Sequence, residues 1–333
     1  MQQFLQTKNN RLEYIDIAKG IGILLVVFGH SSLVLHIENI WIHSFHMPLF
    51  FIITGMCFNE NKYSFAHFLK RRLHQIMVPC LFFTFFIASI EIIIGVRQLD
   101  SLRYGIPHAL WFLPVLFVSQ LVLYNVWVVS RKMVCRLTFI TICLLAWFGI
   151  ANKPPLPYTI QAIPAAIAFI GIGTLITVQE KKWSATQELA LCFVTSVVSV
   201  YVMKSRLNLY ENDLHCPIIA TIAAIMGSCF ILALSKLISH SQKERIKFIF
   251  IWLGRNSLVI MSIHQFFFYL GRTFVKSHLT FTPPHFGKDK YSIWDYRTSS
   301  YTMYFYSGNS VYQQKTQMGC WKINNSYNGQ KHI

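Results

Sequence analysis

Long apolar runs separated by short polar segments dominate the first 270 residues of this 333-residue chain. Because about 20 apolar residues in a helix cross the hydrocarbon core of a bilayer, each long run predicts a membrane-spanning helix. We expect nine spans, at residues 17–36, 41–58, 76–96, 107–129, 136–150, 158–178, 187–204, 215–238 and 246–270. The pattern therefore predicts an all-α fold, a polytopic transmembrane helical bundle.

The end of the chain breaks this pattern. Residues 281–333 are rich in Tyr, Ser, Asn, Gln and Lys, and they contain no run long enough to span a membrane. We therefore divide the chain into an integral-membrane domain, residues 1–280, and an atypical polar tail, residues 281–333. A segment of this composition is interpreted either as disordered or as the product of a frameshift.

Composition agrees with a membrane protein. The chain is 54% hydrophobic and 13% charged, whereas a soluble domain is about 25% charged. Its net charge of +17 comes mainly from Lys and Arg between the apolar runs, so we expect no nucleic-acid partner. The eight cysteines form no CxxC pair, which favours buried apolar side chains over a disulfide framework or a zinc site.

The loop charges predict an orientation. The loops on the N-terminal side of the predicted bundle hold 15 Lys and Arg residues, and the opposite loops hold 5. Since cytoplasmic loops carry the excess of positive charge, we expect the N-terminus in the cytoplasm.

The first span carries ionisable residues, Asp16, Lys19 and His30, although such groups are costly in a membrane. At 100° per residue, Lys19 and His30 share one face and lie about 16 Å apart along the helix axis. Alone, Lys19 would be interpreted as a lysine reaching to the membrane interface, and His30 as a histidine bonded to a neighbouring helix.

Other ionisable residues reach the depth of His30. By helical rise, His46, Glu91 and His264 lie in the outer half of the predicted bundle, which indicates a polar cavity there. Histidine exchanges a proton near neutral pH and can activate a hydroxyl, and a carboxylate such as Glu91 can orient it. His43 lies three residues before His46, but no HxxxH or HExxH motif is present, so we expect no metal site.

Five stretches carry a resemblance to a known family. The chain resembles the membrane acyltransferase-3 family, most closely its fucose 4-O-acetylase branch, in an ordered set of motifs between about residues 11 and 270. They are "YIDIAKGIGILLVVFGH", "FHMPLFFIITGM", "FLKRRLHQIMVPCLFF", "HALWFLPVLF" and "LGRNSLVIMSIHQFFF".

The resemblance implies a membrane O-acetyltransferase. Its expected acyl donor is cytoplasmic acetyl-CoA, a co-substrate, and its expected acceptor is a hydroxyl of a cell-envelope or exported carbohydrate. Lys19 and His30 match the family's basic-x10-His pair, in which Arg is the commoner first residue. The family commonly has ten spans, so nine to ten are expected, in a multi-pass protein of the bacterial plasma (inner) membrane.

These arguments predict three groups of site residues. The catalytic group is His30, Lys19, His46 and Glu91; the group that binds the acyl donor is Lys19, Arg71, Arg72 and Arg136; the group that binds the acceptor is Asp16, Trp111 and His264. The alternative is a transporter or exporter of a glycan or its precursor, because buried ionisable residues also line transport pathways. Transporters often consist of two repeated halves, and the sequence shows no such repeat.

Overall fold

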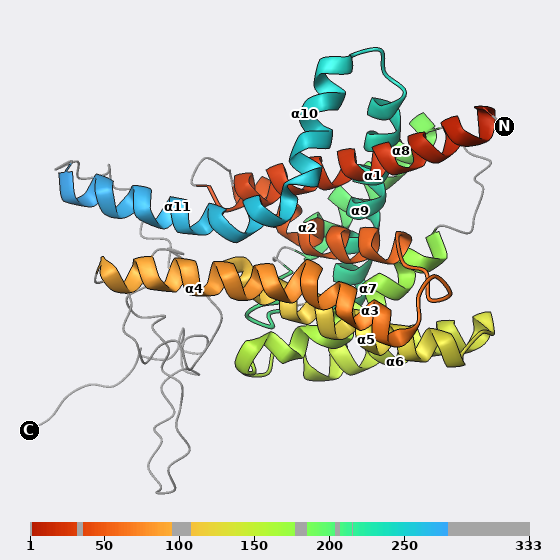
Figure 1. Ribbon diagram of the computed structural model, residues 1–333, viewed down its shortest axis with the longest axis horizontal. Helices are drawn as coiled ribbons and strands as arrows, with labels where there is room; N and C mark the ends of the chain where they lie inside the picture. The colour runs from red at the N-terminus through yellow and green to blue at the C-terminus, as the bar shows by residue number, and fades with distance from the viewer. Residues whose placement is uncertain are drawn as a thin grey trace, which may run out of the picture. The chain divides into compact units, whose positions relative to one another are not determined.

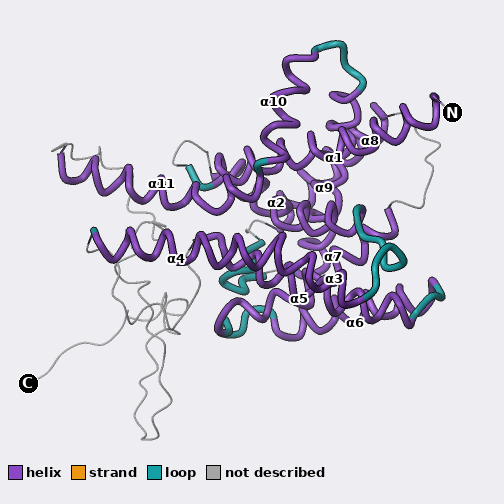
Figure 2. Tube along the Cα trace, in the orientation of Figure 1, coloured by secondary structure: helices purple, strands orange, loops and turns teal. Residues whose placement is uncertain are grey.

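The apolar runs form helices in the computed structural model, which describes residues 2–31, 36–94, 108–176, 185–203, 207–214 and 216–278. All of these residues belong to one unit, Met1–Thr282. This part of the chain is drawn without any strand (Figures 1 and 2). Its only β structure is one isolated bridge between Asn208 and Asp213. The polar tail predicted at 281–333 lies outside the described residues.

The helices follow one another along the chain with short connections. They are α1 (Gln2–Gly29), α2 (His36–Met56), α3 (Phe65–Arg72), a π-helical turn η1 (Leu73–Met77), α4 (Val78–Ile93), a 3-10 turn η3 (His108–Trp111), α5 (Phe112–Val129), α6 (Met133–Ile150), a 3-10 segment η4 (Pro157–Ala162), α7 (Ile163–Ile176), α8 (Ala185–Met203), α9 (Pro217–Ser239), α10 (Glu244–Arg255) and α11 (Ser257–His278).

Five described helices are long and apolar enough to cross a membrane, and a bent pair would make a sixth. This confirms an all-helical, multi-pass membrane protein, whereas the predicted number of nine to ten spans is not confirmed. Three predicted spans are not among the candidates. The first two lie in α1, which has a polar first half, and in α2, which contains three histidines. The third, 187–204, lies in α8, where the apolar helix Thr186–Val202 is shorter. The candidates are Phe65–Ile93, Ala109–Val129, Met133–Ile150, Pro157–Ile176 and Pro217–Ser239.

The last predicted span, 246–270, is not one continuous helix. It consists of α10 and the first part of α11, which are bent by 77° relative to each other. At the bend, the Asn256 side chain donates a hydrogen bond to the Trp252 carbonyl oxygen over 2.8 Å. The same carbonyl oxygen also accepts the backbone N–H of Asn256 over 3.1 Å, so Asn256 bonds to it twice at the end of α10.

Three glycines allow two pairs of helices to cross at close range. A methyl group added to Gly55 in α2 would overlap the Ile170 carbonyl of α7, and one added to Gly173 would overlap the Ile52 carbonyl. Gly254 of α10 lies in the same way against the Asp16 carbonyl of α1. Small residues let backbones approach closely in membrane helix pairs, so these contacts hold α2 on α7 and α10 on α1.

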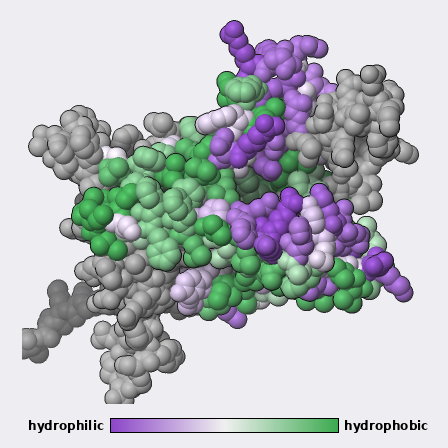
Figure 3. All heavy atoms as spheres, viewed as in Figure 1, coloured by the Kyte–Doolittle hydropathy of each residue, from purple (hydrophilic) through white to green (hydrophobic). Residues whose placement is uncertain are grey.

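Large apolar side chains remain exposed on several helices. Phe82, Phe85 and Ile93 of α4 are between 61% and 82% exposed. In Figure 3 hydrophobic residues cover the region of α4 and α11, and hydrophilic residues gather on α10 and around α3. An exposed apolar surface of this extent is typical of helices that face lipid.

Candidate functional site

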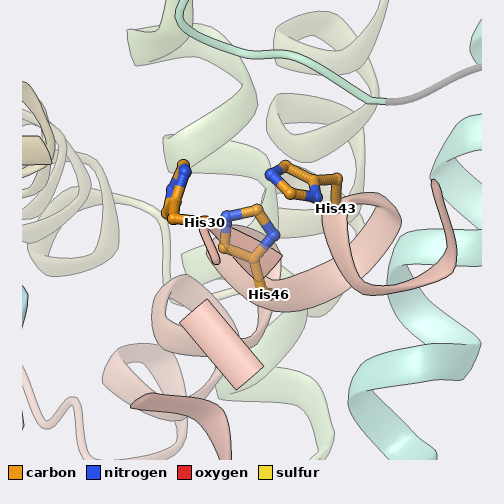
Figure 4. A group of neighbouring side chains, drawn as sticks. All are labelled: His30, His43 and His46. Carbon is orange, nitrogen blue, oxygen red and sulfur yellow. The ribbon is translucent and has the colours of Figure 1, made fainter. Parts of the chain in front are cut away.

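Three histidines meet where α1 ends and α2 begins (Figure 4). Only six residues separate Gly29 from His36, so the end of α1 lies near the start of α2. His30 follows α1 directly, and His43 and His46 lie about one turn apart in α2. The ring centroids of His30 and His43 are 5.4 Å apart, those of His30 and His46 6.3 Å, and those of His43 and His46 4.8 Å.

Helix α11 brings a fourth histidine to this group. The His264 ring centroid lies 5.4 Å from that of His30. Beside it, the Gln265 amide nitrogen lies 3.3 Å from Nε2 of His30, a contact between residues 235 positions apart. The structure thus brings together three of the predicted site residues, His30, His46 and His264.

The backbone sets which ring nitrogen of these histidines carries the proton. Nδ1 of His43 lies 2.8 Å from the Asn39 carbonyl oxygen, Nδ1 of His46 lies 3.0 Å from that of Ile42, and Nδ1 of His264 lies 2.8 Å from that of Met261. A carbonyl oxygen only accepts, so Nδ1 is the protonated nitrogen in each neutral ring. Nε2 is therefore the unprotonated nitrogen of each neutral ring, the kind of atom through which histidine acts as a base or a ligand.

His43 and Gln265 are members of this group that the sequence argument did not assign to the site. The spacing of His43 and His46 places them on one helix face and was a signal for His43. Gln265 had no such signal, because its contact with His30 depends on how α11 packs against α1.

Glu91 and Trp111 lie on other elements. Glu91 is buried in α4, and α4 packs against α11, which carries His264. Trp111 ends η3 and its ring centroid lies 6.0 Å from that of Tyr210.

Lys19 and Asp16 lie on α1, away from the histidines. Lys19 Nζ lies 3.4 Å from Asp16 Oδ1, and Nε of Arg255, at the end of α10, lies 3.4 Å from Asp16 Oδ2. The helix is continuous from here to His30, whose backbone N–H still bonds to the Val26 carbonyl. Lys19 and His30 are thus about 16 Å apart along α1 by helical rise. Arg255 had not been predicted for this end.

The arginines predicted to bind the acyl donor differ in their surroundings. Arg71 is exposed and donates a hydrogen bond to the Tyr63 hydroxyl. Arg72 lies over the Phe68 ring, 5.2 Å from its centroid. Arg136 pairs with Glu60 over 2.6 Å and lies over the Trp127 ring, so its guanidinium already has an anionic partner.

Comparison with known proteins adds a family match and two relatives. The family described as "Acyltransferase domain" matches residues 12–306. The nodulation protein NolL of Sinorhizobium fredii is 38% identical over 86 residues, which cover 22% of this chain and 24% of the relative. The NolL protein of Mesorhizobium japonicum is 27% identical over 150 residues, 37% of this chain and 40% of the relative.

These matches span less than half the length of either relative. No solved structure matches the chain.

Proposed function

This chain belongs to the acyltransferase-3 family, and from that premise we propose that it transfers an acetyl group from acetyl-CoA to a hydroxyl of a cell-envelope or exported carbohydrate. The observation that carries the proposal is the position of His30. It lies among other histidines at one end of α1, while Lys19 and Arg255 meet at Asp16 further along the same helix. One helix thus links a site for a base with a site for an anionic donor.

His30 is the proposed general base. Its imidazole removes the proton of the acceptor hydroxyl while the hydroxyl oxygen attacks the thioester carbonyl carbon of acetyl-CoA. The C–S bond breaks, an ester C–O bond has formed, and the imidazolium returns the proton to the CoA thiolate. His46, whose Nδ1–H bonds to the Ile42 carbonyl, presents its Nε2 lone pair as a second hydrogen-bond acceptor for the substrate. Glu91 is proposed to orient this group from α4.

An alternative chemistry places the acetyl group on His30 first. The imidazole nitrogen would attack the thioester, release CoA and pass the acetyl group from an acyl-imidazole to the hydroxyl. We favour the base role, and the two differ in whether an acetylated histidine forms without an acceptor.

The acyl donor is proposed to bind at the basic end of α1. Acetyl-CoA carries phosphates, which Arg and Lys bind through charge-assisted hydrogen bonds. Lys19, Arg71 and Arg72 are the main candidates, and Arg136 would have to exchange its bond to Glu60 for one to phosphate. We place this end in the cytoplasm of a bacterial plasma membrane, where acetyl-CoA is made, on the strength of the loop charges.

The acceptor is proposed to bind at the histidine end. His264 contributes an Nε2 lone pair there, and Trp111 offers an aromatic ring of the kind on which sugars pack. Asp16 was predicted for this role, yet it lies with Lys19 and Arg255. An acceptor contact from Asp16 would require the carbohydrate to reach that end of α1.

The test is transfer of radiolabelled acetyl from acetyl-CoA to a glycan extract by the purified protein in lipid vesicles. We expect label in the glycan with the native chain and at least a hundredfold lower rate with His30→Ala, since a positioned base contributes about 10² to 10⁴ in rate. His240→Ala is the matched control, because His240 is exposed at the end of α9. An undiminished rate with His30→Ala would overturn the proposal, and glycan transport without acetyl-CoA turnover would favour a transporter.

A further inference from the structure

The histidine group has a geometry that a base alone does not require. We propose that His30, His43 and His46 form a binding site for a divalent cation of the Zn²⁺ type, and that the bound ion inhibits acyl transfer by occupying His30. The inhibitory part rests on the proposed function, whereas the binding part does not.

Nitrogen atoms of the three histidines lie close to one another. One ring nitrogen from each of the three histidines lies within 4.8 Å of the other two. Three such atoms share a point within about 2.8 Å of each, so a closure of about 0.7 Å per ligand would reach the Zn–N distance of 2.0–2.1 Å. A change of this size is within the rotation of a side chain about its own torsions, and it needs no helix movement.

The three imidazole rings are spaced as they would be around one metal ion. Imidazoles bound to one tetrahedral ion through their nitrogens have ring centroids about 5 Å apart. The three centroid separations here are 4.8, 5.4 and 6.3 Å, and the ring planes are between 77° and 89° apart. The rings are therefore not stacked on one another, and in Figure 4 a nitrogen of His43 and one of His46 point toward His30.

The tautomers of His43 and His46 suit metal binding. His43 and His46 donate Nδ1–H to the backbone carbonyls of Asn39 and Ile42, so each presents an Nε2 lone pair. Metal-bound histidines commonly donate their second nitrogen to a backbone carbonyl in this way. A cation bound between the two rings would accept both lone pairs.

An ion could reach the three histidines. His46 is buried, but His30 and His43 are partly exposed, so an ion has an entry path. His264, whose ring centroid is 5.4 Å from that of His30, can supply a fourth nitrogen, and water is the other candidate. Neutral imidazoles favour Zn²⁺, Cu²⁺ and Ni²⁺, whereas Mg²⁺ and Ca²⁺ prefer oxygen ligands.

Occupancy would remove the base. A nitrogen that donates its lone pair to Zn²⁺ cannot also accept the proton of a hydroxyl, because both use the same electron pair. Zinc and the acceptor hydroxyl would thus compete for His30, and removal of zinc by a chelator would restore the rate.

The binding test uses purified full-length protein, stripped with EDTA and titrated with Zn²⁺ or with Co²⁺ as a spectroscopic probe. We expect one ion per chain and the visible d–d absorption of Co²⁺ bound by nitrogen in a four-coordinate site. His43→Ala should weaken binding at least tenfold, and His43→Gln tests the same ligand with a side chain of similar size. His240→Ala, outside the group, should bind as the native chain does, and Mg²⁺ should not displace Co²⁺.

The inhibition test measures the rate of acetyl transfer at increasing Zn²⁺ concentration. The rate of each variant is compared with the rate of the same variant in zinc-free buffer. We expect the zinc concentration for half inhibition to rise at least tenfold in His43→Ala. Native protein that binds no ion, or that binds it equally well after His43→Ala and His43→Gln, would overturn the site. Bound zinc without acetyl transfer in zinc-free buffer would instead refute the proposed function, and full activity with zinc bound would refute the inhibition alone.

Discussion

At the residue scale, the chemistry of this site depends on backbone carbonyls one turn away from each histidine. His43 and His46 bond to the carbonyls four positions earlier in α2, and His264 bonds to the carbonyl three positions earlier in α11. These bonds are local, so any histidine on a helix can form them. What distinguishes these three histidines is that the packing of α2 and α11 brings their rings near His30.

Gln265 is the residue through which we test this positioning. Its amide lies 3.3 Å from His30 Nε2, and Gln265→Ala removes that hydrogen bond without touching the His30 backbone. Since such a bond is worth about 1 kcal/mol, we expect kcat to fall about five- to tenfold. The KM for acetyl-CoA should stay unchanged, because the donor is proposed to bind near Lys19.

Steady-state kinetics against both substrates measure this split. Gln265→Asn, which keeps the amide on a shorter side chain, should recover part of the loss. A rise in the KM for acetyl-CoA with unchanged kcat would contradict a positioning role.

At the scale of elements, the bent pair α10–α11 connects the two proposed halves of the reaction. Arg255 at the end of α10 reaches Asp16 in the middle of α1, and His264 and Gln265 of α11 reach His30, just beyond the C-terminal end of the same helix. The close approach of Gly254 to the Asp16 carbonyl holds this arrangement. The bend thus lets one stretch of chain contact α1 at the donor end and at the histidine end.

The crossing of α2 and α7 gives the test at this scale. Gly173→Ala would place a methyl group against the Ile52 carbonyl, and we expect the unfolding free energy to fall by about 1–3 kcal/mol, as for other overpacked sites. Gly149→Ala in α6 is the matched control, since nothing lies within 4 Å of its added carbon. That change should leave the unfolding free energy unchanged or raise it by up to about 1 kcal/mol, because alanine has a higher helix propensity than glycine.

Thermal unfolding in the same detergent, followed by circular dichroism, measures both variants. Equal unfolding temperatures for Gly173→Ala and Gly149→Ala would show that α2 and α7 do not depend on this contact.

At the scale of the whole molecule, the orientation in the membrane remains a prediction from loop charge. It has consequences for two exposed cysteines, Cys135 in the first turn of α6 and Cys216 just before α9. The predicted topology places Cys135 on the cytoplasmic side and Cys216 on the outer side.

Single-cysteine variants that keep only Cys135 or only Cys216 test this orientation. In intact cells, a membrane-impermeant maleimide should label Cys216 and leave Cys135 unlabelled until the membrane is permeabilised. Labelling of both in solubilised protein is the control for reactivity. The reverse pattern would place the N-terminus outside, and with it the proposed acetyl-CoA site.

The sequence by itself determined the class of the molecule, an all-helical, multi-pass membrane protein. Hydropathy is a property of consecutive residues, so it predicted the membrane helices, and helical periodicity placed Lys19 and His30 on one face of α1. The ordered motifs around these residues indicated the family to which the chain belongs.

Only the tertiary structure decided which distant side chains share the site. His264 and Gln265 reach His30, Arg255 reaches Asp16, and Glu60 pairs with Arg136, because helix crossings and the 77° bend bring these residues together. Crossing angles depend on the fit of two helix surfaces, such as Gly55 against α7, and no local pattern contains that fit. For the same reason the convergence of His30 with His43 and His46 on one point had no sequence motif, although each histidine was visible in the chain.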